Sequence, residues 1–569
     1  MGIEQEARAL QLRLSSKYDF GPEEDIGVAS NQGSPEKRLE LVRSELRPQL
    51  FDYQADLAES ATNLLIEGKR GLLALPTGAG KTRTAVVSCF QFVAEKKTGV
   101  VWLSPTRELV NQAFETAATL WNQFGILESL DLFQGSVPAF RPGKPAIWFT
   151  TPQAIWANRL SLGGGHQWEA IVFDEAHQLE DTLTATVGVT ISASRATTLA
   201  TAMNKVVEDD KLLTELFDAA ALLRTLFSPH IETRLSLPLP VDIVDQLNAL
   251  RITVNSCLDA LRKIDSTLET VRQKVLRAQT LASRFADDLD AVLRVSSTSV
   301  PFVSGTTERP ELVIAPLDVG PILAEFVWPL HTAIMTSATI PLSMPERIGL
   351  SPDKVHVLDV GSPFNYEEQG RLYCATHLPD PNAQRDDAVH DELATLITAA
   401  GGRTLALFTS RRALTSAVEE MRKRLPFRIL AQDENQKPSL LRDFLLDETS
   451  CLFATAGFFE GVDIPGRALS LVVIDRIPFP HRNNPLLAAR RDLHGAKGFT
   501  EIDLPRAITA LAQATGRLIR TRTDKGVVAV LDPRLASKSY RWSIINALPP
   551  LKRIKDINEA TAFLKEITQ

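Results

Sequence analysis

The stretch that decides the fold is Gly71-Leu-Leu-Ala-Leu-Pro-Thr-Gly-Ala-Gly-Lys-Thr82. It opens on a short apolar run, Gly71–Leu75, and continues into a glycine-rich loop that ends in Lys and Thr. Glycines let backbone N–H groups close around phosphates, the Lys reaches the β- and γ-phosphates, and the Thr hydroxyl reaches Mg²⁺. A following helix adds the positive end of its dipole. The sequence therefore predicts a phosphate-binding loop, although the strict pattern has Gly where this chain has Leu75; its candidate residues are Thr77, Gly78, Ala79, Gly80, Lys81 and Thr82.

Similar apolar runs recur along the chain, bounded by turn residues and separated by helical stretches. Strands of a parallel sheet that is covered on both faces have this appearance. We therefore expect two α/β lobes. The strands predicted for the first lobe are Gly71–Leu75, Gly99–Leu103, Ala146–Thr150 and Ala170–Phe173, with Leu312–Ala315 and Thr332–Met335 returning later. Those predicted for the second lobe are Arg403–Phe408, Cys451–Ala454, Leu469–Ile474 and Gly526–Leu531.

The middle of the chain has a different composition. No Gly occurs from Val189 to Ser304, and apolar residues from Leu247 to Val275 recur at spacings of three and four. This periodicity predicts a long amphipathic or coiled-coil-like helix within an all-helical insertion. Its 8 acidic and 8 basic residues between positions 241 and 300 balance, which favours a solvated helix face over a binding surface.

These shifts in composition divide the chain into five segments. We expect an N-terminal extension at 1–48, the first α/β lobe at 49–179, the helical insertion at 180–304, a return to the first lobe at 305–345 and the second lobe at 346–569. The extension should hold a short helix, a loose linker and a second helix that starts near Pro35.

Composition excludes several classes of protein. With 569 residues, of which 44% are hydrophobic and 23% charged, the chain can build a core without disulfides or metals. A net charge of −7 argues against a general nucleic-acid-coating protein but allows a local basic groove. The four cysteines form no CxxC pair, and the N-terminus lacks the apolar core of a signal peptide. No apolar run is long enough to span a membrane, so we expect a cytoplasmic protein with no membrane partner.

A second chemical signal is Ile171-Val-Phe-Asp-Glu-Ala-His177, at the end of a predicted strand. Asp174 is placed to hold Mg²⁺, and Glu175 beside it to orient or deprotonate an attacking water. Acidic residues after a strand also serve as helix caps. Because this pair follows a phosphate-binding loop, the nucleotide interpretation is favoured.

A third signal lies far along the chain, at Gln513-Ala-Thr-Gly-Arg-Leu-Ile-Arg520. Arg517 and Arg520 are three residues apart, so they would share one helix face if the segment is helical. Arginines that reach a γ-phosphate across a cleft stabilise the charge of the transition state. Arginine pairs on helices usually make salt bridges, so the pattern gains its value from the other two signals. We predict that Gln513, Arg517 and Arg520 complete a nucleotide site.

Together, the three signals resemble those of a superfamily 2 helicase, which implies two RecA-like parallel-sheet lobes with ATP and Mg²⁺ bound between them. Gln54, 27 residues before Lys81, stands where that superfamily has a glutamine that reads adenine, although a surface glutamine is an equal alternative. Other motif positions match at Ser104-Pro-Thr-Arg-Glu-Leu109, Thr150-Thr-Pro-Gln153, Thr336-Ser-Ala-Thr339 and Phe408-Thr-Ser410.

Within the superfamily, the chain resembles the XPD/DinG group from residue 50 to about 550, apart from the insertion. The resemblance implies that the insertion is an Arch-like domain that helps enclose single-stranded DNA, and that Asp463 couples the nucleotide to the DNA grip. The matching segments are Ala315-Pro-Leu-Asp-Val-Gly320, Gly361-Ser-Pro-Phe364, Phe458-Phe-Glu-Gly-Val-Asp-Ile-Pro-Gly466, Ile477-Pro-Phe-Pro480 and Leu531-Asp-Pro-Arg534.

One feature departs from this group. Many members carry a four-cysteine iron–sulfur domain, but this chain has no cysteine between Gln112 and Asp174. We therefore expect no iron–sulfur cluster. A DinG branch without the cluster includes a form associated with type IV CRISPR systems.

The resemblance implies an ATP-dependent DNA helicase or translocase that moves 5′→3′ on single-stranded DNA, or on a duplex with a single-stranded tail. One alternative is an accessory helicase of a type IV CRISPR or other defence system, which needs a protein or ribonucleoprotein partner. Others are an ATP-dependent RNA helicase or remodeller, and a scaffold that binds ATP without hydrolysing it. Candidate contacts to the nucleic-acid backbone, each equally explained as a helix cap or turn residue, are Thr106, Arg107, Thr151, Ser410 and Thr455.

Overall fold

The chain forms two compact units in a computed structural model. The two-lobed unit comprises Met1–Leu179, Gly320–Phe479 and Leu504–Gln569, and the helical unit comprises Glu180–Val319 and Pro480–Asp503. The structure describes residues 35–124, 130–135, 145–157, 168–207, 209–264, 268–339, 344–381, 383–455, 458, 466 and 468–568.

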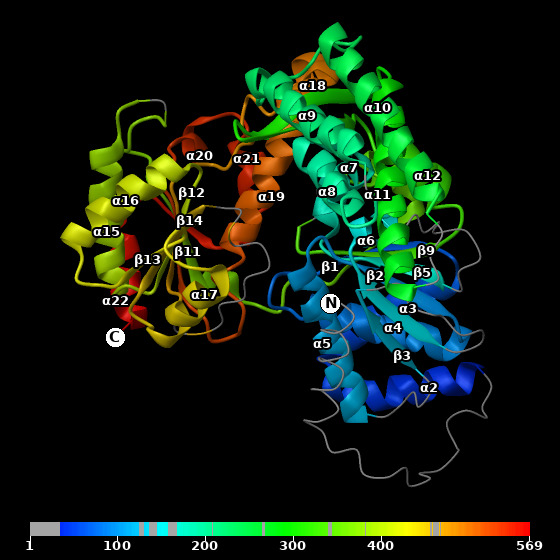
Figure 1. Ribbon diagram of the computed structural model, residues 1–569. Helices are drawn as coiled ribbons and strands as arrows, with labels where there is room; N and C mark the ends of the chain where they lie inside the picture. The colour runs from blue at the N-terminus through cyan, green and yellow to red at the C-terminus, as the bar shows by residue number, and fades with distance from the viewer. Residues whose placement is uncertain are drawn as a thin grey trace. The chain divides into compact units, whose positions relative to one another are not determined.

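A seven-stranded parallel sheet forms the first lobe of the two-lobed unit, in the order β10-β1-β9-β5-β2-β4-β3 (Figure 1). Its inner strands are apolar runs because helices cover both faces of such a sheet, and β2 and β4 are buried at every residue. The strands are β1 (Arg70–Ala74), β2 (Gly99–Leu103), β3 (Asp131–Gln134), β4 (Ala146–Thr150), β5 (Trp168–Phe173), β9 (Thr332–Ser337) and β10 (Val355–Asp359).

Helices cover this sheet, and α2 and α3 both pack on α4. Apolar residues such as Val42, Leu57 and Val86 from these three helices share one core with the strands. The helix predicted from Pro35 is confirmed, whereas residues 1–34 lie outside the described part of the chain. The helices are α2 (Pro35–Leu46), α3 (Asp52–Ile66), α4 (Lys81–Lys96), α5 (Arg107–Phe124), α6 (Pro152–Ala157), α12 (Gly320–Phe326) and α13 (Met344–Arg347).

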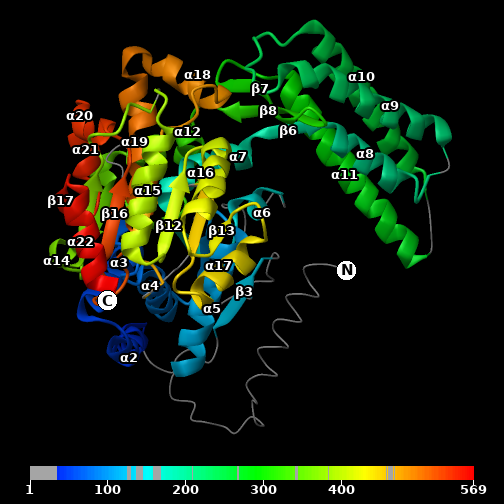
Figure 2. The same cartoon turned by 90° about the vertical axis from the view of Figure 1, so that its left-hand side faces the viewer.

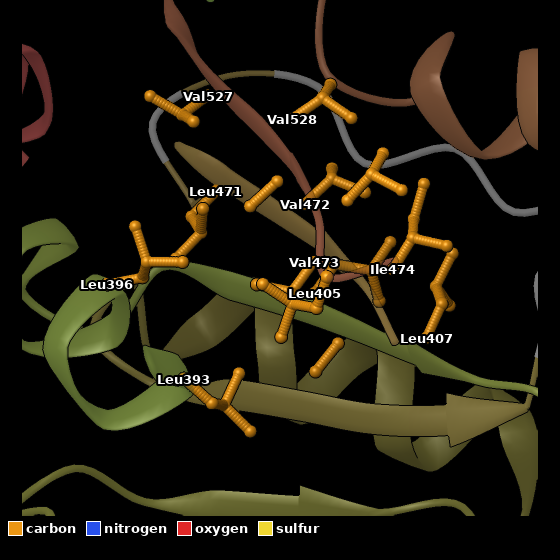
Figure 3. Packing of buried hydrophobic residues seen from close by; sticks show 14 of the residues in the cluster. Leu393, Leu396, Leu405, Leu407, Leu471, Val472, Val473, Ile474, Val527 and Val528 are labelled. Atoms are coloured by element: carbon orange, nitrogen blue, oxygen red, sulfur yellow. The ribbon is translucent and has the colours of Figure 1, made fainter. Parts of the chain in front are cut away.

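A second seven-stranded parallel sheet forms the other lobe, in the order β13-β14-β12-β15-β16-β11-β17. Figure 3 shows its core, where Leu393 and Leu396 of α15 lie over apolar side chains of β12, β15 and β16. Two parallel α/β lobes, as predicted, are therefore confirmed. The strands are β11 (Gly370–Cys374), β12 (Thr404–Phe408), β13 (Ile429–Ala431), β14 (Cys451–Thr455), β15 (Leu471–Ile474), β16 (Gly526–Val530) and β17 (Lys552–Ile554). The helices are α14 (Tyr366–Gln369), α15 (Asp386–Ala400), α16 (Arg411–Arg424), α17 (Lys437–Leu446), α19 (Leu504–Thr515), α20 (Arg534–Ser537), α21 (Arg541–Ile545) and α22 (Ile557–Thr568).

The helical unit holds long helices and a three-stranded antiparallel sheet in the order β6-β8-β7 (Figure 2). The sequence did not predict this sheet, although it identified the strand within β8. The segment Pro480–Asp503 also joins this unit, and its helix α18 packs on β7. The elements are α7 (Leu179–Val187), β6 (Val189–Ser192), α8 (Ala193–Met203), α9 (Asp210–Phe227), α10 (Val241–Arg262), α11 (Glu269–Leu293), β7 (Ser299–Thr306), β8 (Arg309–Pro316) and α18 (Pro485–His494).

The single long helix predicted across 247–275 is wrong, because α10 ends at Arg262 and α11 begins at Glu269. The two helices pack on each other, and Arg251 of α10 forms an ion pair with Asp290 of α11. Folding back buries the apolar stripe of each helix against the other, which one extended helix cannot do alone. Leu268, which fitted the predicted stripe, is instead 64% exposed.

Two strands lie in sheets other than those the sequence suggested. β8, expected to return to the first lobe, pairs with β6 and β7 in the helical unit. β10 was not predicted as a strand; its residues fell within the predicted bounds of the second lobe, but it pairs with β1 in the first sheet. A strand pattern predicts local conformation, but the partner strand is set by the path of the whole chain.

Candidate active site

The first-lobe candidates of the nucleotide site follow three neighbouring strands. The phosphate-binding loop follows β1, Asp174 follows β5, and the Thr336–Thr339 motif begins at the end of β9. These strands are adjacent in the order β1-β9-β5 and run parallel. Their carboxyl ends therefore meet at one edge of the sheet, which is where open α/β sheets bind ligands.

Two glycines shape the phosphate-binding loop. Gly78 and Gly80 have φ angles of +84° and +82°, in the left-handed region that favours glycine. A Cβ at Gly78 would lie 2.7 Å from the carbonyl oxygen of Arg520, and one at Gly80 would collide with the Gln54 amide. The loop thus requires glycine at both positions.

Gln54 lies against this loop from α3. Its Nε2 donates to the carbonyl oxygen of Ala79 at 2.8 Å, and its Oε1 accepts from the backbone N–H of Phe51 at 3.1 Å. The hydroxyl of Tyr53 donates to the same Ala79 carbonyl at 3.0 Å. Gln54 is therefore buried and holds the loop in shape; the predicted contact to adenine stays a prediction.

Lys81 and Thr82 are the first two residues of α4, whose N-terminus faces the loop. The Nζ of Lys81 forms an ion pair with Oε1 of Glu175, and both side chains are largely buried. Backbone N–H groups at this helix start, the Lys81 ammonium and the Thr82 hydroxyl are the groups that a triphosphate with Mg²⁺ requires. The loop, Lys81 and Thr82 are therefore suited to bind phosphates.

Asp174 is 5% exposed and is held from two strands. Its Oδ1 accepts from the Thr336 hydroxyl at 2.8 Å, and its Oδ2 accepts from the Ser104 hydroxyl at 3.1 Å. Burial raises the pKa of Asp174 above its usual value, although the Lys81 ammonium opposes the rise. A fixed carboxylate and the Thr82 hydroxyl supply hard oxygen ligands, which fit Mg²⁺.

Glu175 has a φ of +49°, a conformation that is uncommon for residues other than glycine. Burial alone would raise its pKa, but the charge and hydrogen bond of Lys81, together with the electrostatic effect of His177 and Arg517, outweigh burial and lower the pKa of Glu175. The carboxylate is therefore ionised at neutral pH. An ionised carboxylate next to the phosphate-binding lysine is placed to accept a proton from water.

Gln513 joins this group from the second lobe. Its amide contacts Nε2 of His177, while Nδ1 of His177 lies 3.1 Å from the Ser337 hydroxyl and 3.4 Å from a Glu175 oxygen. Donation by the amide requires the tautomer in which Nδ1 carries the proton. The structure thus brings together residues that lie 336 positions apart in the chain.

Arg517 and Arg520 do not share a helix face, because α19 ends at Thr515. Gly516 follows, and a Cβ there would lie 3.0 Å from the Thr77 hydroxyl oxygen of the phosphate-binding loop. Glycine commonly terminates a helix, so the turn after Thr515 has a local cause. The backbone of Arg520 lies against Gly78, and its N–H donates to a carboxylate oxygen of Asp524 at 2.8 Å. The positive charge of Arg517 helps to lower the pKa of Glu175.

The nucleic-acid candidates lie beside neighbouring strands of each sheet. Thr106 and Thr151 follow β2 and β4, while Ser410 and Thr455 lie at the ends of β12 and β14. The three hydroxyls at 106, 151 and 410 each accept from a backbone N–H near a helix start, at 3.3, 3.3 and 3.2 Å. A capping hydroxyl still carries a hydrogen to donate, so capping and phosphate contact are compatible.

Two further members of this set differ from those caps. Arg107 is exposed at the start of α5. Thr455 donates from its hydroxyl to Oε1 of Gln432 at 2.9 Å, and its N–H donates to the same oxygen at 2.8 Å. Asp463, the predicted coupling residue, lies outside the described residues.

Ser104 and Thr336 position Asp174, and the sequence analysis gave them no role. A signal for both exists, because each is a hydroxyl residue at the carboxyl end of an apolar run. What the sequence lacks is the strand order β9-β5-β2, which places both beside Asp174. Sheet order is a tertiary property that no local pattern encodes.

The cysteines, the candidate metal ligands and the helices give three further findings. Cys89, Cys257, Cys374 and Cys451 are each buried and form no disulfide. Within the described ranges, no group of three His, Cys, Asp or Glu is placed to hold a metal ion. The expected lack of an iron–sulfur cluster stays a prediction. None of the helices that the structure describes is long and apolar enough to cross a lipid bilayer.

Two family models match this chain. A DEAD/DEAH box helicase model matches residues 55–205, and a helicase C-terminal domain model matches residues 393–551. Each match contains one half of the site described above. The first holds the phosphate-binding loop and Asp174, and the second holds Gln513 and Arg517.

Curated relatives and a solved structure agree with these models. The chain is 42% identical over 272 residues to the ATP-dependent helicase DinG of Mycobacterium tuberculosis, covering 46% of this chain and 41% of that protein. It is 32% identical over 417 residues to the ATP-dependent DNA helicase YoaA of Haemophilus influenzae, covering 70% and 64%. A solved XPD helicase matches with a TM-score of 0.60 and 15% identity over 89% of this chain and 100% of that one, which shows a shared fold.

This chain therefore spans less than two thirds of the length of these curated relatives. The two family models and the DinG and YoaA relatives agree that both lobes are helicase domains, and the XPD structure shows a shared fold. The chain is therefore similar in both lobes to the DinG and YoaA helicases, and it carries the two helicase domains that the models describe.

Proposed function

We propose that this chain is an ATP-dependent DNA helicase or translocase that moves along single-stranded DNA. The observation that carries the proposal is the position of Glu175. Glu175 forms an ion pair with Lys81 of the phosphate-binding loop, and the positive charge of Arg517 in the second lobe lowers its pKa. A site that needs both lobes can convert nucleotide turnover into a change in their spacing.

Each residue of the site has a proposed role in turnover. Thr77 to Thr82 hold the phosphates, and Thr82 with Asp174 holds Mg²⁺, which would neutralise charge that develops on them. Phosphates compete with Glu175 for the Lys81 ammonium, which leaves the carboxylate to accept a proton from the attacking water. Gln513, Arg517 and Arg520 stabilise the reacting phosphate from the second lobe. Gln54 is proposed to read adenine, and Asp463 to couple the nucleotide to the DNA grip.

DNA binding is proposed at the backbone of one strand. Hydroxyl and arginine donors beside adjacent strands of each sheet suit phosphate oxygens, and such contacts are salt-sensitive and largely independent of sequence. The candidate donors are Thr106, Arg107, Thr151, Ser410 and Thr455. Movement from 5′ to 3′, a helical unit that helps enclose the strand, and the absence of an iron–sulfur cluster are proposed from the resemblance to the XPD/DinG group.

The test of substrate class is ATPase stimulation by DNA and RNA strands of one sequence and length. We expect single-stranded DNA to raise kcat and RNA to leave it near the unstimulated rate. Equal or greater stimulation by RNA would support the RNA-remodeller alternative instead. If neither strand stimulates hydrolysis, the proposal of a nucleic-acid-driven motor fails.

A partner-dependent accessory helicase, as in a type IV CRISPR or other defence system, would behave differently in one respect. It would hydrolyse ATP on single-stranded DNA but displace no strand alone. Adding a partner protein or ribonucleoprotein would then restore displacement. The ATPase and displacement assays together therefore distinguish a helicase that acts alone from one that depends on a partner.

A further inference from the structure

The chain passes between the two units at four points. These are Leu179/Glu180, Val319/Gly320, Phe479/Pro480 and Asp503/Leu504. Two adjacent residues of α18 in the helical unit, Arg490 and Arg491, contact residues next to all four. All of these contacts lie within the helical unit.

Arg490 contacts residues beside the first two points where the chain passes between the units, Leu179/Glu180 and Val319/Gly320. It is 3% exposed, and its guanidinium lies 2.8 Å from Glu180 and 3.3 Å from Asp181. It also donates to the Thr184 hydroxyl at 2.8 Å and to the Leu317 carbonyl at 2.9 Å. The planar guanidinium fork can serve several acceptors in fixed directions, which a lysine ammonium cannot reproduce.

Arg491 contacts residues beside the other two points, Phe479/Pro480 and Asp503/Leu504. Its Nε lies 2.9 Å from both carboxylate oxygens of Asp503. Its terminal nitrogens donate to the carbonyl oxygens of Arg482 at 2.8 Å and His481 at 3.3 Å. The two arginines thus hold together the four chain segments that enter and leave the helical unit.

The crossings lead directly to the nucleotide site. Glu180 lies three residues after His177, and Leu504, next to Asp503, begins α19, the helix that carries Gln513. Gln513 contacts His177, so α19 is joined at the site to the segment that leads into α7. The two segments are joined a second time through the arginines of α18, which contact Glu180 and Asp503. The result is a closed circuit from His177 through α7, Arg490, α18, Arg491 and α19 back to Gln513.

We propose that Arg490 is a positioning residue that couples the helical unit to ATP turnover. A bound DNA strand that displaces the helical unit would shift α7 and α19 together. The reason is that Arg490 fixes α7 to α18, in the segment Pro480–Asp503 that leads into α19. The shift changes the contact between His177 and Gln513 and hence the rate of hydrolysis. This inference rests on the proposed function, since it concerns how the DNA strand stimulates that site.

The test uses the full chain with Arg490→Gln, Glu180→Gln, the double variant and Arg490→Lys. The matched control is Asp492→Asn, on the same helix, which breaks an exposed ion pair with Arg234 of 3.0 Å. For each variant, kcat and KM for ATP are measured with and without saturating single-stranded DNA. Thermal unfolding is followed in parallel, and the double variant removes both buried charges so that neither is left unpaired.

We expect Arg490→Gln and the double variant to lower the DNA-stimulated kcat about 10- to 100-fold, since small misplacements of a reacting group have effects of this size. The unstimulated kcat and KM for ATP should stay within about twofold, and the two single effects should not add, as expected for one shared contact. Arg490→Lys should restore part of the stimulation. Asp492→Asn should behave as the unsubstituted chain.

Two results would overturn the inference. One is full DNA stimulation in the folded double variant. The other is an equal fall of stimulated and unstimulated rates, which indicates a general structural role. If the unsubstituted chain itself shows no stimulation by DNA, the proposed function fails rather than the role of Arg490.

Discussion

Replacing Glu175 with Gln is expected to lower kcat for ATP hydrolysis about 10²- to 10⁴-fold, the range for loss of a positioned general base. The amide cannot accept the proton of the attacking water, and its neutral side chain no longer pairs with Lys81. Because the lysine then faces the phosphates without a competing carboxylate, ATP affinity should be kept or increased. Steady-state kinetics with single-stranded DNA and equilibrium binding of ATP measure the two effects separately.

The matched control is Glu169→Gln, on the same strand β5 but on an exposed position. It should leave both kcat and ATP affinity unchanged. Normal turnover in Glu175→Gln would remove Glu175 from the role of base and support a scaffold that only binds ATP. Loss of ATP binding in the same variant would show that its main task is to hold the loop.

Replacing Arg517 with Ala is expected to have the largest effect of all. Arginines that stabilise the transition-state charge of a γ-phosphate contribute about 10³- to 10⁵-fold in rate. Arg517 directly follows Gly516, which lies against Thr77, and its charge lowers the pKa of Glu175. The variant should therefore bind ATP and DNA but hydrolyse ATP very slowly, with a smaller change in KM than in kcat.

Lys525→Ala is the control, since Lys525 is an exposed cation just before β16. A fall in kcat no larger than in this control would contradict the role of Arg517. Arg520→Ala, measured alongside, decides between the two arginines. A large loss in Arg520→Ala alone would assign the transition-state role to Arg520.

Most buried inner strands were predicted because their physics is local, although the inner strand β11 was missed. β2 and β4 coincide with predicted runs, since strands covered on both faces need apolar residues at every position. β10 and β17 were missed because they lie at sheet edges, where exposed polar residues interrupt the pattern. Edge strands need less burial, so their sequences carry less signal.

The helical insertion shows a limit of periodicity. Apolar spacing of three and four continued past Arg262, and the break before Glu269 was not predicted. Asp265, Ser266 and Thr267 are residue types that favour helix starts, so a boundary signal was present in the sequence. Periodicity records which face is buried but not whether one helix or two supply that face.

The sequence named candidate residues for the site but not the contacts between them. The phosphate-binding loop and Asp174 lie at one edge of the sheet because their parallel strands, β1 and β5, flank β9. Three sets of contacts depend on sheet order and chain path. They are the contact of His177 with Gln513, the hydrogen bonds that hold Asp174, and the contacts of Arg490. No local pattern fixes those, so they emerge only from the folded chain.

The most direct test of the account is strand displacement with ATP and Mg²⁺ on matched duplexes that carry a 5′ tail, a 3′ tail or no tail. Glu175→Gln serves as the blank, because it should load on DNA without moving. We predict displacement of the 5′-tailed duplex alone, and none in the blank. Displacement that needs a 3′ tail, or that proceeds equally in Glu175→Gln, would contradict an ATP-driven motor that moves 5′→3′ on single-stranded DNA.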